Sequence, residues 1–202
     1  MFELATLGME LWPAEQVRTE RFVLRPYEVG DAEEMQAAIA NSRAELIPWM
    51  PWAVELGTVD ERREFIQGRI DALTKARSEA VDGVNSGEIV YGIWLGDRLV
   101  GGTGIHDRND QTEREIGYWT RTSHARTGVA SEISRALTTE ALRNPAIEQV
   151  LINCDIGNRA SAAIPIKLGY ELVEEFFQIR QTSGEKRLTQ TRVMRRANWD
   201  AQ

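Results

Sequence analysis

Apolar residues recur along this chain with two different spacings, which separate the expected strands from the expected helices. Short runs rich in β-branched and aromatic residues, bounded by Gly, Pro, Asn or Asp, predict strands. The Gly96-Asp97 step joins two of these runs as a hairpin, and Ser183-Gly184 marks the turn between the last two. The expected strands are residues 21–27, 88–95, 98–106, 115–120, 149–156, 170–181 and 187–195.

Apolar positions three and four residues apart predict helices. Asp31 and Asp60 are suited to begin the first two, Asn144-Pro145 to end the third and Gly169 to end the fourth. The expected helices are 31–42, 60–76, 128–143 and 159–168, with polar or proline-rich loops at 47–53, 77–87 and 107–112.

The expected element order is β-α-α-β-β-β-α-β-α-β-β. Antiparallel hairpins in the middle, followed by a strand–helix–strand crossover, predict an α/β (α+β) fold. Its central sheet is mixed but mostly antiparallel, with helices on both faces. A length of 202 residues suits one domain over the whole chain, 1–202.

Composition narrows the class of protein. With 42% hydrophobic and 27% charged residues, the chain has the make-up of an ordinary soluble domain. Its net charge of −7 argues against nucleic acid as the main partner and is compatible with a cationic substrate such as an amine. One cysteine, Cys154, and two histidines, His106 and His124, argue against an internal disulfide and a cysteine- or histidine-rich metal site.

The first residues lack the pattern of a signal peptide, and the longest apolar run is too short to cross a bilayer. We therefore expect a cytoplasmic protein with no membrane partner.

The segment from Glu115 to Ala130 carries the first chemical signal. It is expected to run from a strand through a polar loop into a helix. Gly128 lets the loop backbone approach a ligand, and the free N–H groups at a helix start can hold a phosphate. By itself the segment fits an ordinary loop-to-helix transition better than a ligand site. No Gly-Lys-Ser/Thr follows, so a Walker-type loop is excluded, and no dinucleotide fingerprint is present.

Three segments together resemble the GNAT superfamily of acyl-CoA N-acyltransferases, in its Rim-type branch of ribosomal-protein N-terminal acetyltransferases. Gly128 and Ala130 match the end of the family motif Gln/Arg-x-x-Gly-x-Gly/Ala. Asn158-Arg-Ala-Ser161 with Lys167-Leu-Gly-Tyr170 matches Asn-x-x-Ser … Lys-Leu-Gly-Phe/Tyr, and Trp49-Met-Pro-Trp52 is similar to the Trp-rich loop of the branch. Together with Leu24-Arg-Pro26, the resemblance covers roughly residues 18–195.

The chain departs from the family pattern at Ala125, where the motif has a long polar side chain that helps to orient the loop. Arg126, one position later, is the expected partial substitute.

The resemblance implies an enzyme that moves an acyl group, most often acetyl, from acyl-CoA to a primary amine by direct attack. The amine belongs to a protein N-terminus or to a small molecule, and the reaction needs no metal. Acetyl-CoA, or another acyl-CoA, would lie between splayed strands that end near Thr120 and Ile156. The implied cofactor-binding residues are Tyr118, Trp119, Thr120, Arg126, Thr127, Gly128, Val129, Ala130, Ser131, Asn158 and Ser161.

Glu115 is the candidate general base, because an amine must lose a proton to attack a thioester. The alternative is a structural or substrate-orienting strand carboxylate paired with a nearby arginine. Ser161 is the candidate donor to the departing sulfur, although a serine in a first helical turn often only caps the helix. Backbone N–H groups from Tyr118 to Thr120 could bind the oxyanion.

Several other residues have two interpretations. Trp49 and Trp52 contact the substrate or fill the gap between the first two helices. Tyr170 is expected to be a packing residue and Cys154 a buried apolar one. Pro165 cannot donate to the carbonyl of Ser161, so we expect a kink in its helix or, as the alternative, use of that carbonyl by water or a ligand.

Two alternative functions stay open at this point. One is a non-catalytic acyl-CoA or nucleotide-binding module, which Ala125 favours. The other is a succinyl or longer-chain acyltransferase of the same fold. A homodimer is also compatible with the outer strands and the Trp-bearing loop.

Overall fold

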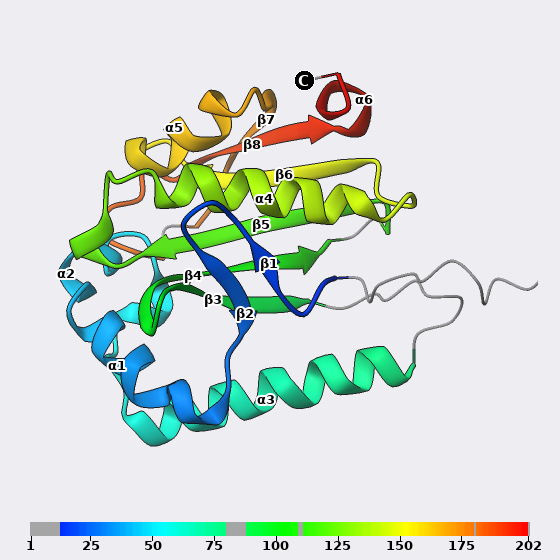
Figure 1. Ribbon diagram of the computed structural model, residues 1–202. Coiled ribbons are helices and arrows are strands. Elements are labelled where there is room, and N and C mark those ends of the chain that lie inside the picture. Colours follow the sequence, from blue (N-terminus) through cyan, green and yellow to red (C-terminus); the bar gives the residue numbers. More distant parts are fainter. Residues whose placement is uncertain (1–12, 80–87, 109–110, 180, 202) are drawn as a thin grey trace, which may run out of the picture.

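The fold is built on one eight-stranded sheet, seen in a computed structural model that describes residues 13–79, 88–108, 111–179 and 181–201. The strand order is β1-β2-β3-β4-β5-β6-β8-β7, and all neighbours are antiparallel except β5 and β6 (Figure 1). The strands are β1 (Val17–Arg18), β2 (Val23–Pro26), β3 (Ile89–Leu95), β4 (Arg98–Asp107), β5 (Glu113–Thr120), β6 (Gln149–Asp155), β7 (Glu171–Phe177) and β8 (Leu188–Arg195). The predicted mixed, mostly antiparallel sheet is confirmed. Parts of the expected loops 77–87 and 107–112 lie outside the described residues.

Helices cover both faces of the sheet (Figure 1). One apolar cluster joins α4 to the sheet, and a second joins α1 and α3 to its opposite face. The helices are α1 (Ala32–Ala40), α2 (Arg43–Leu46), α3 (Val59–Ser78), α4 (Val129–Arg143), α5 (Arg159–Lys167) and α6 (Arg196–Trp199), with 3-10 turns η1 (Val29–Asp31), η2 (Pro51–Ala53) and η3 (Thr122–His124).

The sequence-based expectations miss β1, α2, α6 and the 3-10 turns. Each of these elements has two to four residues, which is too short for a hydrophobic period to be visible. The expected start of the second helix at Asp60 was wrong, because Thr58 caps α3 in a capping box with Glu61. Asp31 is the N-cap residue of α1, as expected. Its carboxylate accepts from the Glu28 N–H and pairs with Arg25, so it makes no side-chain cap bond to α1.

Gly184 in the β7–β8 connection is held against a distant loop. Its N–H donates to the Pro48 carbonyl at 3.0 Å, and a Cβ at this position would lie 2.5 Å from that oxygen. The Thr182 hydroxyl also donates to Pro48. Because only glycine permits this approach, the connection is docked onto the loop that carries Trp49.

The apolar stripe of α4 packs on the sheet as its spacing predicts. Ile133, Leu137 and Ala141 are fully buried, and Leu142 is nearly so. The helix begins at Gly128, whose φ of +88° is in the left-handed region that favours glycine. Since α4 directly follows β5 and η3, this packing fixes where the start of the helix stands relative to the sheet.

Replacement of Leu137 by Ala should lower the free energy of unfolding by about 2–5 kcal/mol, because truncation leaves a cavity under α4. Thr139→Ala, on the exposed side of the same helix, should change it by less than about 0.5 kcal/mol. Urea unfolding followed by circular dichroism measures both values. Equal losses in the two variants would contradict this orientation of α4.

Candidate functional site

The strands β5 and β6 pair for only three residues and then separate. Their parallel register is Glu113↔Gln149, Arg114↔Val150 and Glu115↔Leu151. Beyond these pairs β5 continues to Thr120 against β4, and β6 continues to Asp155 against β8. The expected splay is therefore confirmed, and the inner edge of β5 from Ile116 onward has no strand partner.

Residues from both separated strands line a cavity of about 280 Å³. The cavity brings together five of the predicted site residues from three segments: Trp49, Glu115, Tyr118, Asn158 and Ser161. Trp52, Trp119, Thr120 and residues 126–131 do not line it. Sequence reasoning missed the lining residues Met50, Asn153, Asp155, Gln178, Glu185 and Thr189. Pairing of β6 with β8 brings Asn153, Asp155 and Thr189 there, and the contacts of the β7–β8 connection with Pro48 bring the rest, so no local pattern could have identified the set.

The Glu115 carboxylate stands on one wall of the cavity, with its side chain 12% exposed. Its Oε2 accepts from Arg108 Nε at 2.5 Å and from Asn153 Nδ2 at 2.7 Å. The bond to Glu115 raises the pKa of the Arg108 guanidinium. Both bonds go to one oxygen, so Oε1 accepts none from the described residues. The carboxylate is thus held in place with one oxygen available to a ligand.

Ser161 and Tyr118 face each other across the gap between the strands. The Ser161 hydroxyl donates to the Tyr118 hydroxyl at 3.2 Å, which in turn donates to the Ser161 carbonyl at 3.1 Å. Burial raises the pKa of Tyr118, more than the bond with Ser161 lowers it. The phenol is therefore neutral at pH 7 and acts as a hydrogen-bond donor.

Pro165 explains why that carbonyl is available. In a regular helix the amide at position 165 would donate to Ser161, but proline has no N–H. Neither expected alternative, a kink alone or a carbonyl used by water or a ligand, included the observed partner: the freed carbonyl accepts from Tyr118. The helix breaker thus couples α5 to β5.

Asn158 caps α5. Its Oδ1 accepts from the Ser161 N–H at 3.2 Å, so the amide oxygen is used within the fold. Its Nδ2 donates to no described residue. The side chain therefore keeps its two donors for a ligand, in the same cavity as Ser161.

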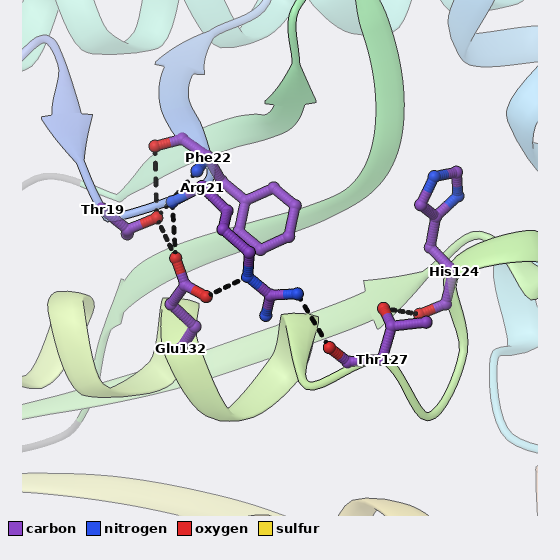
Figure 2. Close-up of polar contacts among 6 residues, drawn as sticks. All are labelled: Thr19, Arg21, Phe22, His124, Thr127 and Glu132. Carbon is purple, nitrogen blue, oxygen red and sulfur yellow. Dashed lines mark hydrogen bonds and ion pairs between the residues drawn. The ribbon is translucent and has the colours of Figure 1, made fainter.

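The expected anion cradle lies at the start of α4 (Figure 2). Glu132 N is the first amide to bond within the helix, to Gly128 O. The N–H groups of Val129, Ala130 and Ser131 donate to no described residue, and they lie at the positive end of the helix dipole. In the preceding loop Arg126 has a φ of +62°, and the Thr127 hydroxyl donates to the His124 carbonyl at 2.8 Å.

The two tryptophans of the proline-rich loop take different positions. Trp49 lines the cavity. Trp52 is 42% exposed and packs edge-to-face on Trp119, with ring centroids 5.9 Å apart. Trp119 in turn packs against the cluster formed by α1 and α3. Of the pair, Trp49 is thus the one in contact with the site.

The surroundings of Cys154 and Tyr170 indicate structural roles for these two side chains. Burial raises the pKa of the Cys154 thiol, which keeps it protonated at the cavity wall. Tyr170 is buried with its hydroxyl 2.6 Å from that of Thr138, as a packing residue should be.

The described part of the chain contains no group of three or more metal-ligating side chains. None of its helices is both long and apolar enough to cross a membrane.

Comparisons with known proteins agree with this geometry. The sequence model of the family described as "Acetyltransferase (GNAT) domain" matches residues 21–171. The chain is 28% identical over 155 residues to YdaF of Bacillus subtilis (strain 168), which is named for a proposed ribosomal N-acetyltransferase activity. That match covers 75% of this chain and 78% of YdaF.

Solved structures share the fold. RimL, an acetyltransferase of ribosomal L7/L12 crystallised with coenzyme A, is 19% identical with a TM-score of 0.78, over 91% of this chain and 99% of RimL. Mycobacterium smegmatis RimJ, in complex with a CoA disulfide, is 19% identical with a TM-score of 0.76, over 92% and 89% of the two chains. MccE, a microcin C7 self-immunity acetyltransferase bound to acetyl-CoA and AMP, is 17% identical with a TM-score of 0.74, over 87% and 93%.

The family model covers well over half of the 202 residues, and the solved acetyltransferase structures share the fold. The chain therefore belongs to the GNAT acetyltransferase family, whose members are acyl-CoA-dependent N-acetyltransferases.

Proposed function

We propose that this protein transfers an acetyl group from acetyl-CoA to the N-terminal amine of a protein. One observation carries the proposal: Glu115 and the Ser161–Tyr118 pair line the same cavity at the point where β5 and β6 separate. The names of YdaF and RimL support a ribosomal protein as the acceptor.

Acetyl-CoA would bind first, along the gap between the strands. The N–H groups of Val129, Ala130 and Ser131 would hold its pyrophosphate, because helix N-termini favour anions. Asn158 Nδ2 would donate to the pantetheine arm. Backbone N–H groups on the free edge of β5, between Tyr118 and Thr120, would bind the thioester carbonyl and later the oxyanion.

The acceptor amine would then lose a proton to Glu115, directly or through a water. The available Oε1 would take the proton, while Arg108 and Asn153 hold Oε2. Nitrogen forms the new bond to the acetyl carbon, and the C–S bond breaks as the tetrahedral intermediate collapses. Positioning of the two reactants accounts for most of the acceleration in such a direct transfer.

The departing thiolate would meet Ser161. Its hydroxyl can hydrogen-bond the sulfur, and Tyr118 is the neutral donor next to it. The thiolate finally takes up a proton and leaves as free CoA.

The charge of the cavity favours a cationic acceptor and an uncharged acyl group. Glu115, Asp155 and Glu185 line it, so a protonated amine is attracted. The second carboxylate of a succinyl group would instead face three carboxylates. We therefore favour acetyl over succinyl.

Two further expectations go with this function. Ribosomal proteins are made in the cytoplasm, which would be the place of action. The homodimer stays a prediction: β7 pairs only with β8, and it carries the exposed apolar residues Leu172, Val173, Phe176 and Phe177.

Gly128→Glu should abolish acetyl-CoA binding, because a carboxylate in the cradle repels and crowds the pyrophosphate. Gly96→Glu is the matched control. It places the same residue at another positive φ, in open space at the β3–β4 turn. Both variants should lose roughly 1 kcal/mol of stability through backbone strain. Isothermal titration with acetyl-CoA separates them, and unchanged affinity in Gly128→Glu would refute the cradle.

Glu115→Gln should lower kcat by roughly 10²-fold, because the amine loses its proton acceptor. Acetyl-CoA affinity should stay within about twofold, because the cofactor does not depend on this carboxylate. Glu113→Gln, on the same face of β5 but outside the cavity, is the control. The assay measures release of free CoA with peptide acceptors. A full-rate Glu115→Gln variant would exclude the base role, and binding without CoA release in the wild type would favour a binding-only module.

Tyr118→Phe should lower kcat by roughly tenfold while acetyl-CoA affinity changes little, because it removes the donor beside Ser161. Tyr170→Phe is the same chemical change at a second buried tyrosine whose hydroxyl also faces another hydroxyl. That variant should lose about 1 kcal/mol of stability and keep its kcat. Equal effects of the two changes on kcat would show that Tyr118 has no specific role.

A further inference from the structure

Four polar residues tie the turn between β1 and β2 to the start of α4, and we call them the clasp: Thr19, Arg21, Thr127 and Glu132 (Figure 2). Glu132 Oε1 accepts from the Thr19 hydroxyl at 2.6 Å and from the Arg21 N–H at 2.9 Å. Arg21 Nε donates to Glu132 Oε2 at 2.7 Å, and Arg21 Nη1 donates to the Thr127 carbonyl at 2.9 Å. One arginine thus spans the helix and the loop before it.

The Glu132 carboxylate is charged and needs this partner. Burial opposes its ionisation, but the bonds from Thr19 and Arg21 outweigh burial and lower the pKa of Glu132. Its side chain is only 20% exposed, in the first turn of α4. An uncompensated negative charge there would repel a phosphate at the same helix end. Arg21 balances that charge.

The bond to Thr127 also sets the direction of a cradle amide. A trans peptide is planar, with its C=O and N–H on opposite sides. When Arg21 holds the Thr127 carbonyl, the N–H of Gly128 must point the other way, away from Arg21. The backbone at this point has a φ of +62° at Arg126 and +88° at Gly128, so the loop needs an external contact to keep one orientation.

We propose that Arg21 is the positioning residue of the acyl-CoA cradle. From the β1–β2 turn, Arg21 supplies the contact that orients the cradle loop. In the family motif, a long side chain at the position of Ala125 supplies this contact. The inference rests on the proposed function. Arg126 is the weaker candidate, because its side chain is exposed and bonds to no described residue.

The test compares acetyl-CoA dissociation constants, by titration calorimetry, with kcat at saturating acetyl-CoA. Arg21→Met should raise Kd roughly tenfold, the loss expected for one charge-assisted hydrogen bond, and should leave kcat within about twofold. Arg21→Lys keeps the charge but cannot bridge Glu132 and Thr127 together, so its Kd should rise by roughly threefold. Arg18→Met, an equal charge change on exposed β1, should alter neither value.

Rescue separates positioning from general stability. Ala125→Gln restores the long polar side chain of the motif, so it should return the Kd of Arg21→Met to within about twofold of the wild type. A clasp that served only stability would not be rescued in this way. Wild-type Kd values in Arg21→Met and Arg21→Lys, or an equal loss in Arg18→Met, would overturn the proposal. Failure of Ala125→Gln to rescue, with kcat falling in parallel, would also overturn it. If the wild type itself bound no acetyl-CoA, the proposed function would fall and this inference with it.

Discussion

The early end of parallel pairing between β5 and β6 is the constraint on which the rest of the site depends. After Glu115 and Leu151 each strand keeps only its outer neighbour, β4 for β5 and β8 for β6, and no described strand pairs with the inner edge of β5. Backbone N–H and C=O groups that lose a partner must find another one, in water or in a ligand. The sheet thus creates an unsatisfied edge inside its own centre, and the cavity with its carboxylate on one wall and its hydroxyls on the other follows from it.

The walls of this cavity come from segments that are remote in sequence and are joined by a few polar contacts. Pro48 accepts from Gly184 and Thr182, which closes the Trp49 loop onto the β7–β8 connection. Outside the cavity, Arg21 and Glu132 join the β1–β2 turn to the start of α4 in a similar way. Such contacts lie far from the reacting atoms. They nevertheless fix the geometry, because a small displacement of a positioned group is costly in rate.

Local exceptions to regular structure recur where the site is built. Pro165 withholds an amide from α5, and Tyr118 takes the carbonyl that it frees. Positive φ angles at Arg126 and Gly128 place the loop before α4, and a Cβ on Gly128 would come within 3.2 Å of Arg21. These features cost stability in isolation and persist because the surrounding contacts over-determine them.

The sequence by itself determined seven of the eight strands, the four long helices, the mixed sheet and the family, because hydrophobic period, turn residues and short motifs are local properties. It also identified Glu115, Asn158, Ser161 and Trp49, which share one cavity. Only the tertiary structure decided that Asn153 and Arg108 donate to one oxygen of Glu115. The same holds for the hydrogen bond between Tyr118 and Ser161 and for the bond from Arg21 to the Thr127 carbonyl. Those contacts join residues that belong to different elements of the fold. They depend on strand register and helix docking, which a local sequence pattern does not specify.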